Sequence, residues 1–550
     1  MQHPYKNLEN FTLPSLLERS IKLYSHRDSF GFVGESAMSY AEFNEKIQKM
    51  VFLLRKNGIT KGDKVLLLSE NMPHWGVAYF ATTYFGAVIV PVLPDFHPSD
   101  VHHIIRHSEA KAIFVSERHL STIEESEHHN INFVISLDNL KLIDELTHKH
   151  HKVQEPKEVL QKPLEDDFAA LIYTSGTTGH SKGVMLSHKN LTTNAVSSYS
   201  KVTIFPTDVF LSILPLAHTL ECTVGFLVPL LHGSSVYYVN KAPTPSVLLK
   251  AFEIVRPTMM LSVPLIIEKI YKNKILPKFT GSFIMRTLYS LSFIRKILNK
   301  IAGKKLIETF GGRMRFFGIG GAGLSPHVEE FLIEAKFPYI IGYGLTETSP
   351  LIAGSILGEK VKLRSTGTAF PDVIIKIKDK NPETGEGEII IQSPGLMMGY
   401  YKDEEKTHEV IKDGWFYTGD LGHMDEEGFL FISGRSKNVI IGSGGENIYP
   451  EQLESIINEN EAVLDALVLE QNGKLVARIH LDYELMDKMF HADKMPDAQV
   501  RENIAQYLEK MRIEINAQVS SFSKIAKFIE QIEPFVKTPT KKIKRYLYTE

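Results

Sequence analysis

Short apolar runs alternate with amphipathic segments through the first 165 residues of the chain. Apolar positions recur with helical spacing from Tyr40 to Asn57, whereas Val65–Leu68 and Ala112–Val115 are apolar runs with the length of buried strands. Helices that alternate with buried strands are typical of α/β layers around a parallel sheet. The polar stretch from Glu117 to Lys162 interrupts the alternation, and we interpret it as a segment that is exposed to solvent.

One apolar stretch imitates a membrane span. Trp75 to Pro94 contains no charged residue over 20 residues, which is close to the thickness of a bilayer. Gly86 and Ala87 separate a helix-like first half from the β-branched run Val88–Val92. We therefore predict a buried helix that leads into a buried strand, with a transmembrane helix as the alternative.

A segment rich in glycine and hydroxyl groups follows the predicted strand Phe168–Ile172. Because Ser187 precedes a helical pattern, we place this segment, 173–183, in a loop between a strand and a helix. Exposed N–H groups, hydroxyls and the cation of Lys182 would suit a polyphosphate. The Walker pattern is absent, because Ser181 stands where its Gly-Lys-Ser/Thr run would begin. A plain surface loop is the alternative.

The segment from Lys269 to Ile307 has ten basic residues and no acidic one. The pattern predicts a basic amphipathic helix, which either packs one face on the core or contacts a membrane surface or an amphiphile. Its apolar positions are Ile284, Leu288, Leu291, Ile294, Leu298 and Ile301, and its basic positions include Arg286, Lys296 and Lys300.

Two glycine-rich loops follow strands in the middle of the chain. Phe316–Ile319 leads into Gly320, and Tyr339–Ile341 leads into Gly342. Ligands usually bind beyond the carboxyl ends of strands in α/β sheets. Short β runs between 366 and 431 predict a smaller β-rich subdomain, and the chain beyond 451 reads as a small α+β unit. We place the boundary at Lys437, with domains 1–436 and 437–550.

Composition narrows the class of protein. The 550 residues are 43% hydrophobic and 23% charged, which is ordinary for a globular protein of several compact parts. The net charge of −3 gives no overall basic surface, so we expect no nucleic-acid partner. A single cysteine, Cys222, and an N-terminus without a signal-peptide pattern predict a cytoplasmic location, with peripheral contact at the inner face of the membrane if the basic segment binds lipid.

Five motifs occur together in a fixed order, and together they are far more specific than any one alone. They are Tyr-Thr-Ser-Gly-Thr-Thr-Gly at 173–179, Gly-Tyr-Gly-Leu-Thr-Glu-Thr at 342–348, Tyr-Thr-Gly-Asp-Leu-Gly at 417–422, Gly-Arg-Ser-Lys at 434–437 and Thr-Pro-Thr-Lys-Lys-Ile-Lys-Arg at 538–545. Over nearly its full length the chain resembles the adenylate-forming superfamily of acyl-CoA synthetases, nonribosomal adenylation domains and luciferases. Pro215–His218 with Glu221, the basic segment and Thr538–Thr540 resemble the long-chain fatty acyl-CoA synthetases.

The resemblance implies a ligase that uses ATP, Mg²⁺ and CoA. A fatty-acid carboxylate would attack the α-phosphate of ATP to give acyl-AMP and pyrophosphate, and the CoA thiol would then attack the acyl carbonyl. Two alternatives stay open: transfer to an acyl carrier protein, and a nucleotide-binding regulator without catalysis. The implied fold is a large N-terminal domain of layered α/β sheets with a β-rich subdomain, plus a small mobile C-terminal α+β domain.

Similarity to the family also implies the site residues. ATP and AMP would be bound by Thr174, Ser175, Gly176, Thr177, Thr178, Gly179, Lys182, Gly320, Gly321, Ala322, Tyr343, Gly344, Thr346, Asp420 and Arg435. Lys542, Thr346, Glu347 and His218 would act in catalysis, Glu347 and Thr174 at Mg²⁺, Gly444 and Gly445 at CoA, and Lys437 as the hinge. Structural roles are the alternatives, such as a helix cap for Glu347, a core tyrosine for Tyr343, a buried histidine for His218 and a solvated tail for Lys542.

Four positions depart from the family pattern. Lys541 stands where many members have glycine, and Val536, Ser181 and Gly323 stand where many have proline. Neither Ser181 nor Gly323 removes a phosphate donor, so we expect activity to survive these two changes.

Overall fold

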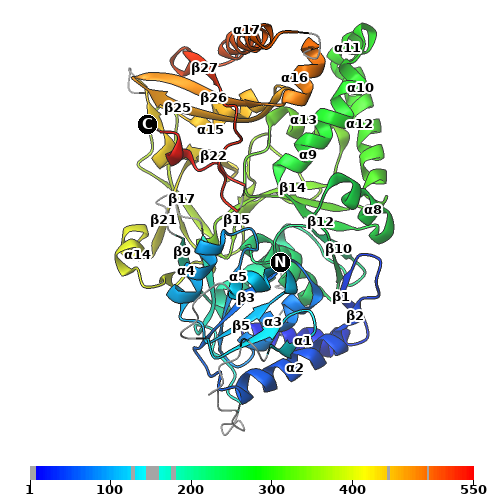
Figure 1. Cartoon of the computed structure of the whole chain (residues 1–550), viewed down its shortest axis with the longest axis vertical. Coiled ribbons are helices and arrows are strands. Elements are labelled where there is room, and N and C mark those ends of the chain that lie inside the picture. Colours follow the sequence, from blue (N-terminus) through cyan, green and yellow to red (C-terminus); the bar gives the residue numbers. More distant parts are fainter. Residues whose placement is uncertain are drawn as a thin grey trace. The chain divides into compact units, whose positions relative to one another are not determined.

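The computed structural model describes residues 8–124, 131–143, 146, 160–174, 181–442, 446–491, 495–539 and 541–549. Contacts among the residues divide the chain into two compact units. The first unit is Met1–Ile375 with Ile391–Phe416, and the second is Lys376–Ile390 with Tyr417–Glu550. Figure 1 labels the helices and strands of both.

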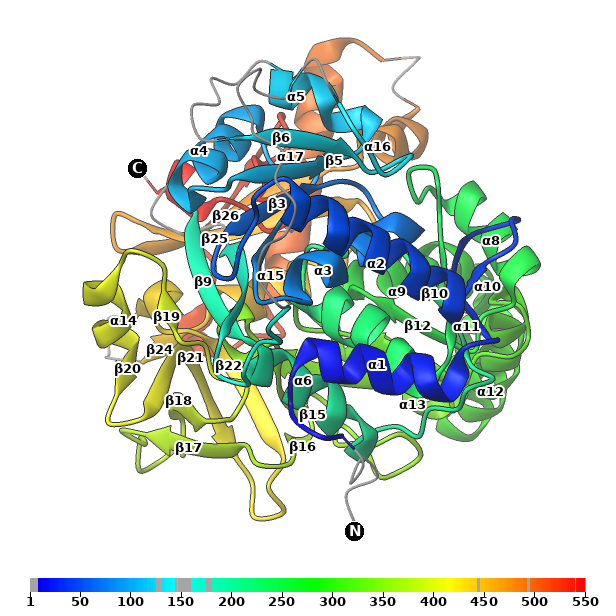
Figure 2. The ribbon, with the colours of Figure 1, turned by 90° about the horizontal axis from the view of Figure 1, so that it is seen from below.

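The first unit contains an eight-stranded sheet with the order β19-β9-β8-β4-β3-β5-β6-β7. Its central strands are parallel, and antiparallel strands cover both edges. Figure 2 shows α4 and α5 on one face of this sheet and α2 and α3 on the other. The strands are β3 (Lys64–Leu68), β4 (Val88–Val92), β5 (Ala112–Val115), β6 (Phe133–Ser136), β7 (Lys141–Leu142), β8 (Phe168–Thr174), β9 (Lys182–Ser187) and β19 (Gly399–Tyr400).

A second sheet of the first unit has nine strands in the order β16-β15-β14-β13-β12-β10-β11-β1-β2. Its parallel centre brings β13 and β14 side by side, and with them the two glycine-rich loops. The strands are β1 (Asp28–Phe32), β2 (Met38–Ser39), β10 (Val209–Ser212), β11 (Ser235–Tyr238), β12 (Met259–Ser262), β13 (Phe316–Ile319), β14 (Tyr339–Gly344), β15 (Leu351–Gly354) and β16 (Thr368–Ala369).

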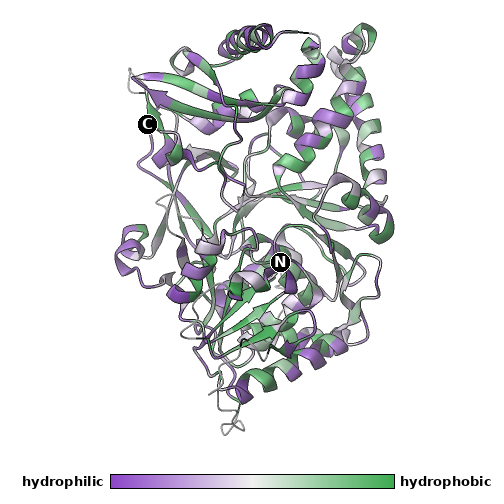
Figure 3. Cartoon of the chain, in the orientation of Figure 1, coloured by the Kyte–Doolittle hydropathy of each residue, from purple (hydrophilic) through white to green (hydrophobic). Residues whose placement is uncertain are grey.

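Helices of the first unit follow the predicted alternation with strands. They are α1 (Leu13–Tyr24), α2 (Tyr40–Lys56), α3 (Pro73–Thr83), α4 (Pro98–Ser108), α5 (Leu120–Glu124), α6 (His188–Ser197), α7 (Val228–His232), α8 (Pro245–Val255), α9 (Pro264–Ile270), α10 (Leu276–Thr280), α11 (Phe283–Ser290), α12 (Ser292–Thr309), α13 (Pro326–Ala335) and α14 (Glu404–Val410). Figure 3 shows hydrophobic and hydrophilic residues alternating along α2, as the sequence pattern predicts.

The uncharged stretch that begins at Trp75 is the buried helix α3, followed by the buried strand β4. Every residue from Trp75 to Thr83 is buried in the fold, which confirms the prediction of a helix that leads into a strand. Within the described ranges, the chain contains no helix with the length and apolar character that a bilayer span requires.

The stretch Glu117–Lys162 is not wholly exposed to solvent as predicted, because its apolar run Phe133–Ile135 is buried in β6, which pairs with β5. Two other details of the predicted pattern are wrong. The segment 173–183 connects two antiparallel strands, β8 and β9, and not a strand and a helix. The reason is that Val184 and Leu186 complete a strand whose residues pair with Ile172 and Ala170, and the helix α6 begins only after the capping box at Ser187.

The basic segment is the second difference, because it is not one helix. Its residues fall into the end of α9, a π-helical turn Tyr271–Ile275, and the helices α10, α11 and α12. Leu291 has extended backbone angles (φ −82°, ψ 111°), so the apolar stripe predicted across it is interrupted. In α12 the buried side consists of Asn299, Gly303 and Leu306, whereas Ile301 is 49% exposed.

A five-stranded sheet contains the points at which the chain passes between the two units. Its order is β17-β18-β21-β20, with β22 beside β21. The bounds are β17 (Ile374–Lys378), β18 (Gly387–Gln392), β20 (Ile411–Lys412), β21 (Trp415–Met424) and β22 (Leu430–Arg435). This sheet is the β-rich subdomain predicted between 366 and 431.

The C-terminal part of the second unit is α+β, as predicted. A three-stranded sheet of β25 (Val463–Gln471), β26 (Lys474–Leu481) and β27 (Lys527–Glu530) packs with α15 (Pro450–Asn458), α16 (Tyr483–Phe490) and α17 (Asp497–Asn516) around one apolar core. Lys437 lies in the 3-10 turn Ser436–Asn438, inside the second unit. The domain boundary at Lys437 stays a prediction.

Candidate active site

The entrance to the predicted phosphate loop is a pair of facing residues. Thr174 ends β8 and Lys182 begins β9, and the two are partners in the antiparallel ladder. A side chain at Gly183 would come within 2.8 Å of Leu171, so glycine suits this close packing. The loop residues Ser175, Gly176, Thr177, Thr178 and Gly179 lie outside the described residues.

The second predicted phosphate contact lies in a tight turn after β14. Thr346 and Glu347 begin the 3-10 turn Thr346–Thr348, which ends at Ser349 in the left-handed region (φ 68°). A Cβ at Gly344 would lie 1.6 Å from the carbonyl oxygen of Pro350, so only glycine fits there. The backbone carbonyl of Glu347 accepts a hydrogen bond from the N–H of Met397 at 2.8 Å. The turn therefore has a fixed backbone.

Gly320 brings the loop after β13 next to the segment that carries His218. A Cβ at Gly320 would lie 3.0 Å from the side chain of Leu220. The ring Nδ1 of His218 accepts a hydrogen bond from the N–H of Leu220 at 3.2 Å, which holds the half-buried ring close to its own backbone. Gly321 has a positive φ of 88°. Gly321 and Ala322 are both exposed, so a ligand could contact them.

Tyr343 and Gly344 extend β14 beyond its parallel pairing with β13. They pair instead with β15, and the register shifts between them. The side chain of Tyr343 is half-buried, and Gly344 is exposed. The prediction that these residues bind ATP and AMP stays open, because nucleotide binding and core packing by Tyr343 both fit this burial.

A π-helical turn, Glu221–Leu227, connects His218 to the turn that carries Glu347. The hydroxyl of Thr223 donates to the carbonyl oxygen of Ser349 at 3.1 Å. Glu221 is fully buried, and burial raises the pKa of its carboxyl to about 8, although a hydrogen bond with Ser212 lowers it. At neutral pH this carboxyl is therefore mostly protonated.

Tyr400, which no sequence motif singles out, contacts two of the predicted site residues. Its hydroxyl donates to Oε1 of Glu347 at 2.8 Å, and Nζ of Lys182 lies 5.4 Å from the centre of its ring. Tyr400 lies 53 positions beyond Glu347, and no spacing rule connects the two. Only the glycine and the aromatic pair at 399–401 could have drawn attention to this position.

In the second unit, Asp420 and Arg435 are neighbours across β21 and β22. Nε of Arg435 lies 3.2 Å from Oδ1 of Asp420, whose side chain is only 7% exposed. The preceding turn is fixed, because Thr418 donates to the carbonyl of Ile389 and accepts from the N–H of Asp420. The structure therefore brings this predicted pair together.

Lys542 lies on an exposed turn that starts at Thr538. The N–H of Thr538 donates to the carbonyl of Lys542 at 2.7 Å, and the hydroxyl of Thr538 accepts from the N–H of Lys542 at 3.1 Å. Lys541 has a positive φ of 63°, a conformation that glycine adopts without strain. This backbone geometry explains why glycine would suit the position.

Arg545 anchors the chain just after this turn. Its guanidinium donates to Oε1 of Glu454 at 2.6 Å and to the carbonyl of Val468 at 2.6 Å. Glu454 lies on α15 and Val468 on β25, so the segment that carries Lys542 is attached to both. Gly444 and Gly445 lie outside the described residues, between the short paired strands β23 (Ile440–Ile441) and β24 (Asn447–Ile448).

In the described part of the chain, no three or more His, Cys, Asp or Glu side chains form a group that could hold a metal ion. Mg²⁺ is usually bound by one or two carboxylates together with substrate phosphates, so a single carboxylate such as Glu347 fits this ion. Oε1 of Glu347 accepts the Tyr400 hydroxyl, and the second carboxylate oxygen adds acceptor capacity for a cation.

Comparison with known proteins identifies the family. The model of the AMP-binding enzyme family matches residues 17–401, so the chain belongs to this family. It is 30% identical to the peroxisomal long chain acyl-CoA synthetase 7 of Arabidopsis thaliana, over 94% of this chain and 81% of that protein. It is also 30% identical to fatty acyl-CoA synthetase B of Dictyostelium discoideum, over 86% and 77% of the two chains.

Solved structures share the fold. O-succinylbenzoate coenzyme A synthetase of Bacillus subtilis, in complex with AMP, has a TM-score of 0.74 at 23% identity, with 97% of this chain and 98% of that chain covered. A fatty acyl CoA synthetase of Mycobacterium tuberculosis has a TM-score of 0.66 at 22% identity, with 98% and 97% covered. These likenesses confirm the predicted α/β class with a large N-terminal and a small C-terminal part.

Proposed function

We propose that the protein is a long-chain fatty acid–CoA ligase, which activates a fatty acid with ATP through acyl-AMP and transfers the acyl group to CoA. AMP and pyrophosphate are the other products. The observation that carries this conclusion is the similarity to long-chain acyl-CoA synthetases, at 30% identity over most of both chains. Fatty acid, ATP and CoA are the substrates.

The residues of the first unit would perform the adenylation. A carboxylate that approaches a polyphosphate concentrates negative charge, so the step needs cations and oriented donors. Lys182 and the loop before it would hold the β- and γ-phosphates, and Thr346 the α-phosphate. Glu347 would bind Mg²⁺, which neutralises phosphate charge when bound. Support comes from Tyr400, which contacts both Lys182 and Glu347.

Residues of the second unit would act in the same reaction. The carboxylate of Asp420, held beside Arg435, would accept hydrogen bonds from the ribose hydroxyls of the nucleotide. Lys542 would place its ammonium at the α-phosphate and the fatty-acid carboxylate. The fixed turn around Lys542 and its anchor at Arg545 support this assignment. CoA would contact the segment of Gly444 and Gly445, and an acyl carrier protein is the alternative acceptor.

One experiment tests the proposed function. ATP–pyrophosphate exchange is measured with Mg²⁺ across a series of fatty acids from acetate to palmitate, and thioester formation is then measured with CoA and with a phosphopantetheinylated carrier protein. We expect exchange to need both Mg²⁺ and a fatty acid, to favour long chains, and to lead to acyl-CoA. Equal exchange with acetate and palmitate would contradict the long-chain assignment, and loading of carrier protein alone would change the acceptor.

We also propose that α10, α11 and α12 bring the enzyme to anionic membranes, where long-chain acids partition. Phe283 is 82% exposed and Phe293 is 77% exposed, so these helices present large apolar side chains to solvent. Lys296 and Lys300 lie exposed on the same helix as Phe293, and no acidic residue occurs between 269 and 307. Exposed aromatic groups among cations fit the interface of an anionic bilayer.

Vesicle binding tests this surface. Co-sedimentation with vesicles of phosphatidylcholine and phosphatidylglycerol should weaken at high salt, because exposed charges are then screened. Lys296→Gln with Lys300→Gln should weaken it too, and so should Phe283→Ser with Phe293→Ser. The matched controls are Lys49→Gln on α2 and Leu23→Ser on α1, both exposed and outside the segment. If neither high salt nor either double variant weakens vesicle binding, the proposed membrane surface is wrong. That result would not affect the proposed ligase activity.

The cytoplasmic location, with this peripheral contact, is part of the same proposal.

A further inference from the structure

We infer that Tyr400 is a positioning residue for the adenylation step, and that it orients Glu347 toward Mg²⁺ and Lys182 toward the phosphates. This inference rests on the proposed function. Tyr400 lies outside the five motifs and has no assigned role in them. Three sets of contacts support the inference: those that fix the tyrosine, its bond to the carboxylate, and its contact with the ammonium.

The backbone of Tyr400 is fixed on both sides. The strand β19 pairs with β9, with Tyr400 opposite Val184 and Gly399 opposite Met185. The N–H of Tyr400 donates to the hydroxyl of Thr407 at 2.9 Å, and a Cβ at Gly399 would lie 2.9 Å from the methyl carbon of Thr407. Tyr400 is only 7% exposed. A tyrosine held in this way has few rotamers available.

The hydroxyl of Tyr400 fixes the carboxylate of Glu347. It donates to Oε1 at 2.8 Å, while the backbone of the same glutamate is held by Met397. An ionised carboxylate accepts at about four positions, so one hydrogen bond orients it and still leaves acceptor positions for a cation. Partners that hydrogen-bond to a metal-binding carboxylate usually set its orientation and affect metal affinity about 10-fold to 100-fold.

The ring of Tyr400 contacts the cation of the phosphate loop. Nζ of Lys182 lies 5.4 Å from the ring centre, within the range of a cation–π contact. Lys182 is also the first residue of β9, the strand that pairs with Tyr400's own strand. One rigid side chain thus contacts the ammonium with its face and the carboxylate with its hydroxyl. A nucleotide phosphate with its metal ion needs both charges at defined positions.

The test separates the hydroxyl from the ring. Tyr400→Phe keeps the ring and removes the bond to Glu347, whereas Tyr400→Leu removes both. Binding of ATP is measured by calorimetry without fatty acid, at several Mg²⁺ concentrations and with EDTA, so that the readout does not depend on turnover. We expect Tyr400→Phe to raise the Mg²⁺ concentration needed for half-maximal tight binding about 10-fold and to leave binding in EDTA unchanged. Tyr400→Leu should weaken ATP binding in EDTA as well.

Tyr401→Phe is the matched control. Tyr401 is the next residue, and its hydroxyl donates to Glu109 at 3.1 Å at the surface. We expect wild-type Mg²⁺ dependence for this variant. Thermal unfolding of each apo variant shows whether the fold is intact, and Tyr400→Phe should unfold close to the wild-type temperature.

Each outcome decides one question. Wild-type Mg²⁺ dependence in Tyr400→Phe would overturn the inference, and so would an equal loss of binding with and without Mg²⁺, because that result indicates a structural role. If the wild type binds ATP in a Mg²⁺-dependent manner but shows no exchange with any fatty acid, the proposed function fails, while the comparison of the two variants still tests Tyr400.

Discussion

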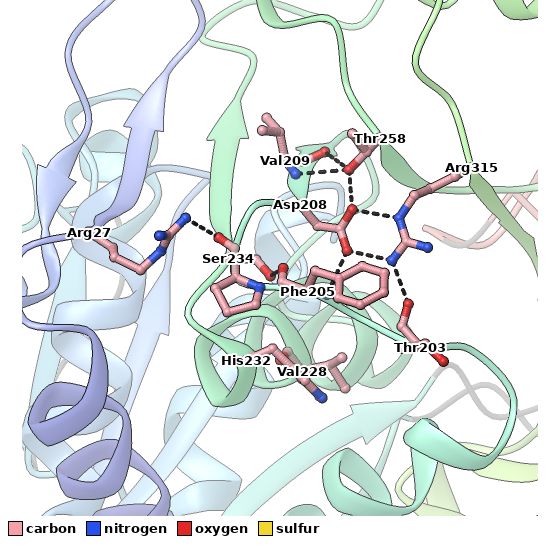
Figure 4. Close-up of polar contacts among 11 residues, drawn as sticks. Arg27, Thr203, Phe205, Asp208, Val209, Val228, His232, Ser234, Thr258 and Arg315 are labelled. Carbon is pink, nitrogen blue, oxygen red and sulfur yellow. Dashed lines mark hydrogen bonds and ion pairs between the residues drawn. The ribbon is translucent and has the colours of Figure 1, made fainter.

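Asp208 and Arg315 form an ion pair with two parallel hydrogen bonds at the amino ends of β10 and β13. Nε of Arg315 donates to Oδ1 of Asp208 at 2.7 Å and Nη2 donates to Oδ2 at 2.6 Å (Figure 4). Thr258, just before β12, donates to the same carboxylate at 2.8 Å. The ion pair and Thr258 therefore connect the amino ends of three parallel strands, β10, β12 and β13. The loops of the candidate site follow the opposite, carboxyl ends of the strands in this sheet.

Asp208→Asn should destabilise the fold without changing the chemistry. The side chain of Asp208 is 3% exposed, and its loss of charge leaves Arg315 without a counter-ion. Because Arg315 is itself 30% exposed, we expect a loss of about 2 kcal/mol, less than for a fully buried pair. Urea unfolding measures the change, and kcat at low temperature should stay within about 2-fold of wild type. Lys49→Gln, which breaks an exposed pair with Glu45, is the control and should cost less than about 0.5 kcal/mol.

The contribution of Asp208 should depend on pH. Burial would raise the pKa of this carboxyl, but the hydrogen bonds from Arg315, Phe205 and Thr258 outweigh it and hold the pKa below the ordinary 3.8. A lowered pKa stabilises the fold above the unfolded-state value, and this stabilisation is lost as the pH falls through the folded-state value. The difference between wild type and Asp208→Asn should thus be constant from pH 7 to 5 and shrink below pH 4. A difference that grows in acid would contradict the assignment.

The stability that Glu221 contributes should change with pH in the opposite direction. Burial raises the pKa of its carboxyl from 4.5 to about 8, so the folded state holds the proton that the unfolded state loses. The stability from this group is complete below pH 4.5 and is lost as the pH rises through about 8, by up to about 1.4 kcal/mol per pH unit. Glu221→Gln resembles the protonated form. We expect its stability relative to wild type to increase between pH 5 and 8, and a flat difference over that range would show that the carboxyl ionises normally.

The turn at Lys542 yields a prediction about three neighbouring lysines. Lys542→Ala should reduce fatty-acid-dependent pyrophosphate exchange about 100-fold and leave thioester formation from supplied acyl-AMP largely intact, because a charge that stabilises one transition state affects one half-reaction. Lys541→Gly should retain exchange, since φ at this residue is 63°. Lys544→Ala is the control on the other side. Greater damage from Lys541→Ala or Lys544→Ala than from Lys542→Ala would assign the role to a different lysine.

Much of the fold could be predicted from the sequence, because apolar runs and their spacing report burial directly. β5 begins and ends at the predicted residues, Ala112 and Val115, and the stretch after Trp75 is the predicted helix and strand. The pattern failed where an apolar run had two interpretations. Val184–Leu186 pairs as a strand although a helix follows directly, and Leu291 interrupts a stripe that has regular helical spacing.

The candidate site could be predicted only where local motifs carry the chemistry. Thr174, Lys182, Glu347 and Asp420 stand in such motifs. The first three lie at strand ends or in a short turn, and Asp420 lies within β21. Tyr400 could not be found in this way, because its partners are distant in sequence and the contact depends on how β19 pairs with β9. Positive φ at Lys541 is likewise a property of the folded turn and not of the residue type.

The predicted hinge role of Lys437 leads to the last prediction. The two half-reactions need different groups at one acyl carbonyl, Lys542 first and the CoA-binding segment near Gly444 later. Lys437 is exposed in a short 3-10 turn, and hydrogen bonds connect the segments on its two sides. Gln452 donates to the carbonyl of Ser433 at 3.1 Å, and Tyr449 donates to Glu386 at 2.8 Å. Both hydrogen bonds are partly buried, and bonds to water would replace them during a rotation at a net cost of about 1 kcal/mol each.

Proline at this position should hold the turn. Its fixed φ of about −65° suits a 3-10 turn and resists rotation away from it. We therefore expect Lys437→Pro to retain pyrophosphate exchange and to accumulate bound acyl-AMP, while acyl-CoA formation falls about 10-fold or more. Lys437→Ala removes the charge and keeps the rotation free, so it should form acyl-CoA at close to the wild-type rate. Single-turnover assays of each half-reaction measure the two effects. If Lys437→Pro forms acyl-CoA normally, or loses both half-reactions equally, the hinge lies elsewhere, whereas equal losses in Lys437→Ala and Lys437→Pro would indicate that the ammonium and not the backbone matters.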